Sequence, residues 1–225
     1  LAIFDRTSRS LTLLSSPTPT ILGQQFLELT SVAVTASGEI FVADAQQGKV
    51  FGLDREGNLL LTIGKTGSVI YPSAIAVDSI RRIVYIADKH AHAVRIFTTN
   101  GDWVRDITVA GENKRLAAPA GVALAVDGSC FVLDERSRRV HVYSQEGEYL
   151  RSFRIATDIP GETTQPSGIA VDSDGHIYIS DVFNNTIIIL GKNGEYLQRL
   201  GRTADPREGF WSPGGLFIDN RDFIY

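Results

Sequence analysis

The densest group of charged residues lies in the stretch VLDERSRRVHVY, at positions 132–143. Arg136, Arg138 and Arg139 stand there beside His141. Guanidinium groups at this spacing could bind carboxylates or phosphates, including the backbone of a nucleic acid. The alternative is structural, because Arg138 and Arg139 could instead pack over neighbouring turns or pair with acids. The choice depends on whether the stretch is unique in the chain.

Metal or acid–base chemistry would need histidines and carboxylates that converge on one point. Asp78, Asp172 and Asp219 end strands at matching places, and a hard cation binds oxygen ligands of this kind. Turn closure is the alternative role for each of them. The four histidines fall in three different structural settings: His90, His92, His141 and His176. Because Zn²⁺ needs three or four converging ligands, we predict no zinc site, no catalytic residue and no cofactor.

The composition narrows the class of protein. The 225 residues carry a formal net charge of −4 with a pI near 5.6, whereas nucleic-acid-binding domains are usually basic. The single cysteine, Cys130, excludes an intrachain disulfide and is expected to be a buried apolar residue. No apolar stretch is long enough to span a bilayer. The chain opens on LAIF and contains no methionine, so we expect an internal portion of a longer product.

The chain is built from an internal repeat. Four prolines stand 47 residues apart and open the stretches PSAIAVD, PAGVALA, PSGIAVD and PGGLFID. These prolines are Pro72, Pro119, Pro166 and Pro213. A series of aspartates ends the stretches FVAD, YIAD, FVLD and YISD, at Asp44, Asp88, Asp134 and Asp181. DERSRR is therefore one of several equivalent turns, with DAQQGK, DKHAHA and DVFNNT as counterparts.

Each repeat predicts four short β-strands. The first follows the proline, and the second ends at the aspartate. The third begins six residues later, as VFGL, VRIF, VHVY and IIIL, and the fourth follows a glycine-containing turn such as TNGD. Alternating or continuous apolar patterns favour strands, and no stretch has helical periodicity. A four-stranded unit repeated every ~40–50 residues is typical of the blades of a β-propeller.

The N-terminus fits two registers. LAIFD could be a third strand, which gives five blades, or Asp5 could belong to the aspartate series. The second register fits better, because an apolar strand starts six residues after Asp5, as it does after Asp134. We therefore predict an all-β, six-bladed propeller that is one domain, incomplete at both ends. The blades are expected at residues 1–27, 28–71, 72–118, 119–165, 166–212 and 213–225.

The repeat resembles the NHL repeat. The match is closest over PSGIAVDSDGHIYISDVFNNTIIILGKNGEYLQRLG, residues 166–201, and the family's Asn-His-Arg turn is kept in part at Asn184, His92 and Arg139. The resemblance covers essentially the whole chain. It implies a six-bladed platform for protein, RNA or small-molecule partners, although a few relatives are metal-dependent lyases or lactone hydrolases. The regular turns also resemble those of bacterial extracytoplasmic NHL proteins, which implies a periplasmic or cell-surface location.

The turns after the second strands share one rim of a propeller with the loops between blades. This rim combines basic and aromatic side chains, as binding hot spots do. Phe183 stands out because its position holds a polar residue in the other repeats. The expected binding residues are Phe183, Arg136, His90, Lys89, Arg6, Trp211 and Tyr71. Trp211 could alternatively be a loop anchor packed between blades.

The innermost strands direct no His, Asp, Glu or Cys toward a channel. We therefore predict a non-enzymatic module that holds a protein partner on the rim. Two alternatives stay open. A propeller enzyme of the lyase or lactonase kind would contain a stoichiometric divalent metal. An RNA-binding domain would lose affinity steeply with salt, because phosphate contacts release counterions.

Overall fold

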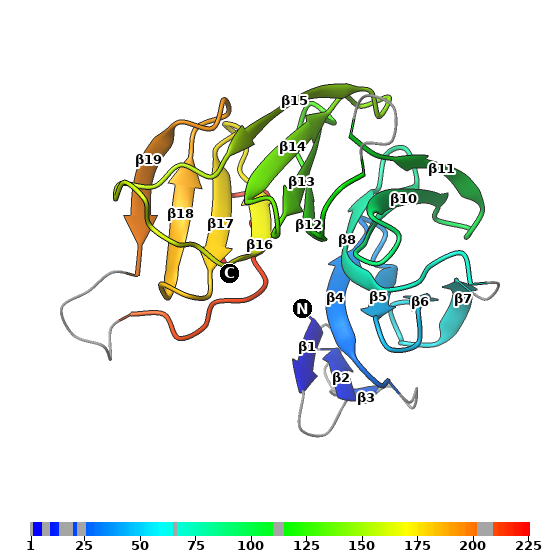
Figure 1. Cartoon of the computed structure of the whole chain (residues 1–225). Coiled ribbons are helices and arrows are strands. Elements are labelled where there is room, and N and C mark those ends of the chain that lie inside the picture. The colour runs from blue at the N-terminus through cyan, green and yellow to red at the C-terminus, as the bar shows by residue number, and fades with distance from the viewer. Residues whose placement is uncertain are drawn as a thin grey trace. The chain divides into compact units, whose positions relative to one another are not determined.

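In the residues that the structure describes, the regular structure is entirely β-strand (Figure 1). The computed structural model describes residues 2–5, 10–13, 20–21, 26–64, 67–109, 115–201 and 209–225, with the backbone alone described up to residue 21. The expected near absence of helix is confirmed over this part of the chain. Within it, no helix is long and apolar enough to cross a membrane.

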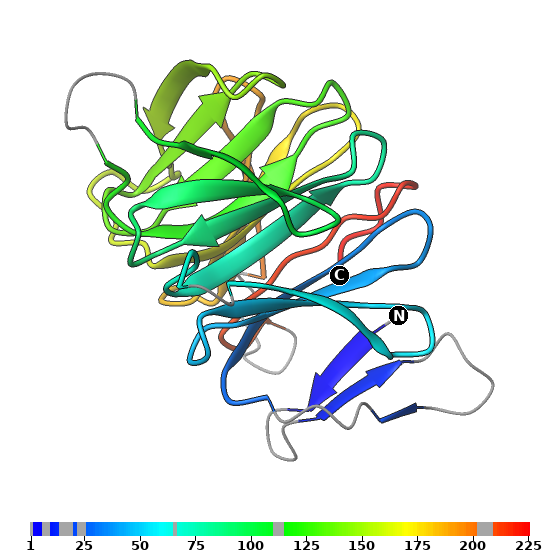
Figure 2. The same cartoon turned by 90° about the vertical axis from the view of Figure 1, so that its right-hand side faces the viewer.

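The chain divides into two compact units, Leu1–Ile107 and Thr108–Tyr225. The first unit opens with a three-stranded sheet of β1 (Ala2–Asp5), β2 (Ser10–Leu13) and β3 (Thr20–Ile21), drawn in dark blue in Figure 2. The second blade contains β4 (Leu29–Val34), β5 (Ile40–Asp44), β6 (Lys49–Leu53) and β7 (Leu59–Ile63). The third contains β8 (Pro72–Asp78), β9 (Ile83–Asp88), β10 (Ala93–Thr98) and β11 (Trp103–Ile107). The two innermost strands, β4 and β8, lie side by side.

The second unit contains two further blades. The fourth blade contains β12 (Pro119–Leu124), β13 (Cys130–Asp134), β14 (Arg139–Tyr143) and β15 (Tyr149–Arg154). The fifth contains β16 (Pro166–Val171), β17 (Ile177–Asp181), β18 (Thr186–Leu190) and β19 (Tyr196–Leu200). In every blade, consecutive strands are antiparallel neighbours. This order confirms the four strands per repeat that the sequence predicted.

The expected count of six blades differs from the structure. Over the described residues, four sheets have four strands, and the described part of residues 1–27 forms the three-stranded sheet β1–β3. Residues 213–225 form one isolated bridge, between Ile218 and Ile224. By repeat register these 13 residues hold only an innermost strand and part of the next, which is too little for a four-stranded sheet. The register chosen for the N-terminus fits the pairing, since Asp5 lies opposite Ser10 as Asp44 lies opposite Lys49.

The aspartate that ends each second strand closes two connections at once. In the fifth blade, Asp181 Oδ1 accepts hydrogen bonds from the backbone N–H groups of Gln165 (2.9 Å), Phe183 (3.2 Å) and Asn184 (3.3 Å). Asp44, Asp88 and Asp134 accept equivalent bonds from the incoming loop and from the following turn. A buried carboxylate is tolerated here because several donors solvate it. The bond to the following turn is the type that an aspartate commonly makes, whereas the bond to the incoming loop joins residues 16 to 18 positions apart.

The fourth residue after each of these aspartates has a left-handed backbone. Its φ is 59° at Gly48, 58° at His92, 53° at Arg138 and 55° at Asn185. Side chains other than glycine and asparagine are strained in this region. The turn geometry therefore recurs even where the residue type disfavours it.

The blades pack through apolar faces. In the second unit, Leu133, Val140 and Val142 of the fourth blade form one cluster with Ile179 and Ile188 of the fifth. A second cluster joins the second and third blades in the first unit. Each fully buried side chain of this size contributes about 1.5–3 kcal/mol. Cys130 is buried, as the sequence predicted.

Candidate binding surface

The fifth-blade turn holds Phe183 in an exposed position. The backbone on both sides is fixed by Asp181, and Asn184 Nδ2 donates to the other oxygen of this carboxylate (2.7 Å) and to Thr163 O (2.8 Å). The Phe183 ring is nevertheless 63% exposed. An apolar ring on a fixed turn can be buried by a partner with little loss of backbone entropy.

Two further aromatic residues lie beside this turn. The N–H of Ser212 donates to Asn185 Oδ1 at 2.8 Å, which ties the loop carrying Trp211 to the turn. The Phe210 ring lies over Gly201, where an added Cβ would be 2.2 Å from it. Trp211 is 86% exposed, so its alternative as a packed loop anchor does not fit this geometry. We call Phe183, Phe210 and Trp211 the aromatic patch.

The fourth-blade end gathers five arginines. Asp134 accepts the N–H groups of Ala117, Ala118 and Ser137, which brings the loop at residue 115 beside the turn at 135–138. Pairing of β14 with β15 places Arg139 opposite Arg154. We call the resulting set, Arg115, Arg136, Arg138, Arg139 and Arg154, the arginine cluster. Sequence analysis singled out the three in DERSRR and missed the two that the turn and the strand register bring to them.

Arg139 is the member with the clearest structural role. Its Nε and Nη2 donate to Ser152 Oγ at 3.0 and 2.8 Å, and Nη2 also donates to Ser152 O at 3.2 Å. This agrees with the structural alternative for this residue. Arg136 and Arg138 are exposed, so packing over a neighbouring turn does not describe them.

The loop at residues 155–165 connects the two surfaces. Ile155 N–H donates to Arg138 O at 3.1 Å, and Asn184 contacts Thr163 at the other end. The two acids of this loop bind Arg199, whose side chain is only 4% exposed: Asp158 lies at 2.8 Å and Glu162 holds the guanidinium through two oxygens. The hydrogen bonds that Arg199 donates to the Glu162 carboxylate raise the pKa of Arg199.

The first unit carries the other predicted rim residues. The rings of Tyr71 and His90 stack with centroids 4.6 Å apart, and Tyr71 OH donates to Glu28 at 2.7 Å. Lys89 N–H donates to Tyr71 O at 3.0 Å. Arg6 lies outside the described residues. The structure therefore brings Tyr71, His90 and Lys89 together in this unit.

The three candidate carboxylates each close their own turn. Partial burial by itself raises the pKa of Asp78, but hydrogen bonds from Arg81 outweigh it and leave the pKa lowered. The pKa of Asp172 is lowered in the same way, because hydrogen bonds from His176 and Tyr178 outweigh the effect of its burial. Asp219 accepts the N–H of Phe223. Over the described ranges, no group of three or more His, Cys, Asp or Glu residues could hold a metal ion.

His141 lies inside the fourth blade. Its side chain is buried, its Nε2 is 3.9 Å from Asp134, and neither ring nitrogen has a hydrogen-bond partner. Burial lowers the pKa of His141 more than the nearby carboxylate raises it. At the same repeat position in the third blade, Arg95 Nε donates to Asp88 at 3.1 Å. His141 thus stands where the third blade has an arginine that donates to the aspartate, but His141 does not form the equivalent hydrogen bond.

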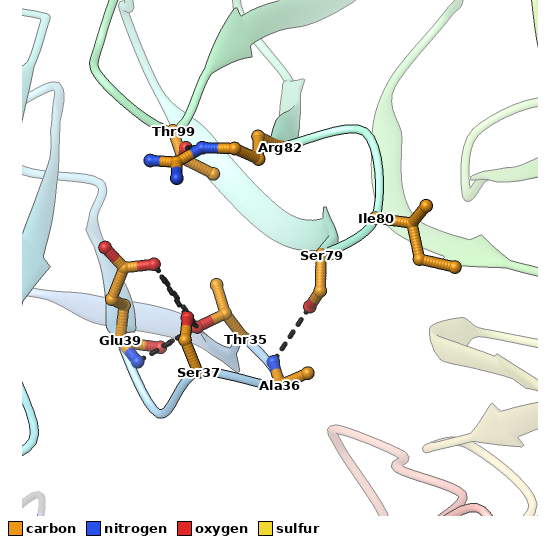
Figure 3. A pocket seen from close by; sticks show the side chains of 8 residues that line it. All are labelled: Thr35, Ala36, Ser37, Glu39, Ser79, Ile80, Arg82 and Thr99. Atoms are coloured by element: carbon orange, nitrogen blue, oxygen red, sulfur yellow. Dashed lines mark hydrogen bonds between the residues drawn. The ribbon is translucent and has the colours of Figure 1, made fainter.

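A polar pocket of about 340 Å³ lies in the first unit, between the β4–β5 and β8–β9 turns (Figure 3). Its lining residues are Thr35, Ala36, Ser37, Glu39, Ser79, Ile80, Arg82 and Thr99. Ser37 Oγ bonds Glu39 at 3.0 Å, and Arg82 Nε donates to Thr99 at 3.2 Å. Sequence analysis did not single out this pocket. The repeat register gave no signal for it, because Glu39 stands five residues before Asp44 whereas Arg82 stands six before Asp88.

Comparison with known proteins supports a propeller built from NHL repeats. The NHL repeat family profile matches residues 163–190. Protein brain tumor of Drosophila melanogaster is 27% identical over 138 residues, which is 59% of this chain and 13% of that protein. The chain thus spans about an eighth of the length of this relative.

Solved structures show the same fold. A streptogramin B lyase structure superposes with a TM-score of 0.69 at 14% identity, covering 90% of this chain and 63% of that one. A catalytically inactive virginiamycin B lyase from Staphylococcus aureus with quinupristin gives 0.72 at 13% identity, covering 96% and 72%. A chain of a nidogen–laminin complex gives 0.72 at 16%, covering 95% and 78%. At these identities the likeness establishes an all-β propeller of four-stranded blades and no activity.

Proposed function

We propose that this chain is a non-enzymatic binding module that holds a protein partner on the loop-rich ends of its blades. The observation that carries the proposal is the aromatic patch on the fifth blade. Exposed Trp and Phe side chains that are fixed by their backbone are the residues that dominate the energy of protein interfaces. The position of Phe183 holds Gln46, His90 and Arg136 in other repeats, so the fold itself does not require an aromatic ring there.

Capture of a partner by patch variants tests this proposal. The partner is first isolated from an extract of the native cells and then purified. The double variant Phe183→Ala/Trp211→Ala should weaken its binding by at least about tenfold, because hot-spot truncations cost about 2 kcal/mol or more. Leu150→Ala/Leu197→Ala is the matched control, since these side chains are similarly exposed on the outer strands β15 and β19. Equal affinity of both double variants and the parent chain would refute the proposed surface.

A second candidate is a metal-dependent lyase or lactonase-like enzyme, which the fold of the streptogramin and virginiamycin B lyases favours. The carboxylates that the sequence suggested for a cation, Asp78, Asp172 and Asp219, each bind groups of their own turn, so only the likeness of fold supports this candidate. Elemental analysis of protein purified without chelator tests it, because the enzyme would retain about one equivalent of divalent metal. RNA binding is the third candidate and is tested by its salt dependence.

Two finer features complete the proposal. We propose six blades, because the proline and aspartate series continue into residues 213–225 and back to Asp5. We also propose an extracytoplasmic location. Fractionation of the native cells, with the chain followed by an antibody, tests the location.

A further inference from the structure

The arginine cluster has no acidic counterpart in the part of the chain that the structure describes. None of its five members makes an ion pair with any residue in the described ranges. Other arginines of this chain do find acids, as Arg95 binds Asp88 and Asp106, and Arg199 binds Asp158 and Glu162. Arg55, Arg82, Arg105 and Arg151 also lack an ion pair in the described ranges. What distinguishes this end of the fourth blade is that five such arginines gather there.

Three acids near the cluster bind other groups. Asp134 is buried and accepts three backbone N–H groups. Asp158 and Glu162 are bound to Arg199. Arg139 and Arg154 also lie directly opposite each other on neighbouring strands, where like charges destabilise a sheet. The cluster thus leaves positive charge unneutralised at a small cost in stability.

The cluster is continuous with the aromatic patch. Arg138 O accepts the N–H of Ile155, at the start of the connecting loop. Thr163, near the end of that loop, accepts Asn184 Nδ2, and Asn185 in turn accepts Ser212 N–H. The connecting loop is thus hydrogen-bonded to the arginine-bearing turn near one end and to the turn that carries Phe183 near the other.

We propose that this combined surface binds an acidic polypeptide segment that carries an aromatic or aliphatic anchor residue. Carboxylates of the segment bind the guanidinium groups, which suit bidentate contacts, and the anchor packs on the aromatic patch. The inference rests on the proposed function and names the chemistry of its partner. A protein segment is favoured over RNA because its acids can be confined to the arginine cluster and its apolar anchor to the aromatic patch. RNA carries a phosphate at every nucleotide, and the net charge of −4 opposes those phosphates that lie outside the cluster.

Binding of a defined probe tests the proposal. The probe is a short fluorescein-labelled peptide of glutamates and aspartates with one central phenylalanine, measured by fluorescence anisotropy against the whole chain. The comparison probes are the same peptide with glutamine in place of every acid, and single-stranded RNA of equal charge. The acidic peptide should bind most tightly, and its affinity should fall with added salt.

Two charge variants localise the site. Arg136→Gln/Arg154→Gln should weaken binding of the acidic peptide by about tenfold. Lys192→Gln/Arg221→Gln removes the same charge from two other turns, the one between β18 and β19 and the one after Asp219. This variant should change the affinity for the acidic peptide by less than about twofold. Phe183→Ala should weaken binding of the acidic peptide but leave its salt dependence unchanged. Equal melting temperatures of the variants and the parent chain exclude loss of folding.

The failures of this proposal and of the proposed function are distinguishable. If the isolated partner still requires Phe183 and Trp211 but the acidic peptide does not bind, the acidic-segment proposal is overturned and the protein-binding function stands. If the RNA binds more tightly than the peptide and depends on Arg136 and Arg154, the proposal is overturned in favour of a nucleic acid. Loss of peptide affinity in both charge variants alike would also overturn it.

Discussion

Replacement of Asp181 by alanine should destabilise the fifth blade and release Phe183. The carboxylate accepts three backbone N–H groups, from Gln165, Phe183 and Asn184, together with the Asn184 side chain. Asp181→Ala leaves these three backbone donors without a partner. Each unsatisfied donor costs about 1–3 kcal/mol when buried. These donors are partly buried, so the low end applies and the sum is about 3 kcal/mol.

Asp181→Asn should cost less. An amide oxygen in the place of Oδ1 keeps all three backbone bonds, and only the bond between Oδ2 and Asn184 Nδ2 is lost or reversed. We expect a loss of about 1–2 kcal/mol, which is one hydrogen bond to a charged group. Urea unfolding followed by circular dichroism gives the free energies, with Asp174→Ala as the control because that exposed acid lies on another turn of the same blade. If Asp181→Ala were no less stable than Asp181→Asn, the assigned role of the carboxylate would be wrong.

Three further predictions concern single side chains. Burial lowers the pKa of His141 in the folded chain, so on acidification the unfolded chain is protonated at His141 first. The free energy of unfolding should therefore fall as the pH drops below about 6.5. His141→Phe should reduce this pH dependence, measured by urea titrations at several pH values. Arg138→Gly should stabilise the chain by about 0.5 kcal/mol and so raise its melting temperature slightly. The reason is that the φ of Arg138 is 53°, a conformation that glycine adopts freely and that Gly48 has at the same repeat position; a lower melting temperature would contradict this. Arg199→Gln should cost about 2 kcal/mol and speed proteolysis near Glu162, whereas unchanged cleavage would argue against that anchor.

The positions of the strands could be predicted because the signals are local. A proline opens each first strand, an aspartate ends each second strand, and glycine marks the tight turns, so each repeat can be divided without knowledge of the others. The number of blades could not be fixed in this way. The repeat signals are only partly present at residues 1–27 and 213–225, and a local pattern does not encode how the sheets associate.

The binding surface was only partly predictable, for a related reason. Phe183 was visible because the repeat alignment places it among polar residues. The arginine cluster was visible only as DERSRR, since Arg115 and Arg154 are distant in sequence and reach it through the Asp134 hydrogen bonds and the Arg139–Arg154 register. Contacts set by tertiary register and by buried hydrogen bonds cannot be deduced from residue types alone.

Photo-cross-linking tests the central claim most directly. A benzophenone amino acid is placed at position 183, at the tip of the fifth-blade turn, and in a second chain at position 150, where Leu150 is similarly exposed on the outer strand β15. Irradiation with the purified partner should give a covalent adduct from position 183 and little from position 150. Equal yields, or an adduct from position 150 alone, would contradict a protein-binding surface on the loop-rich ends of the blades.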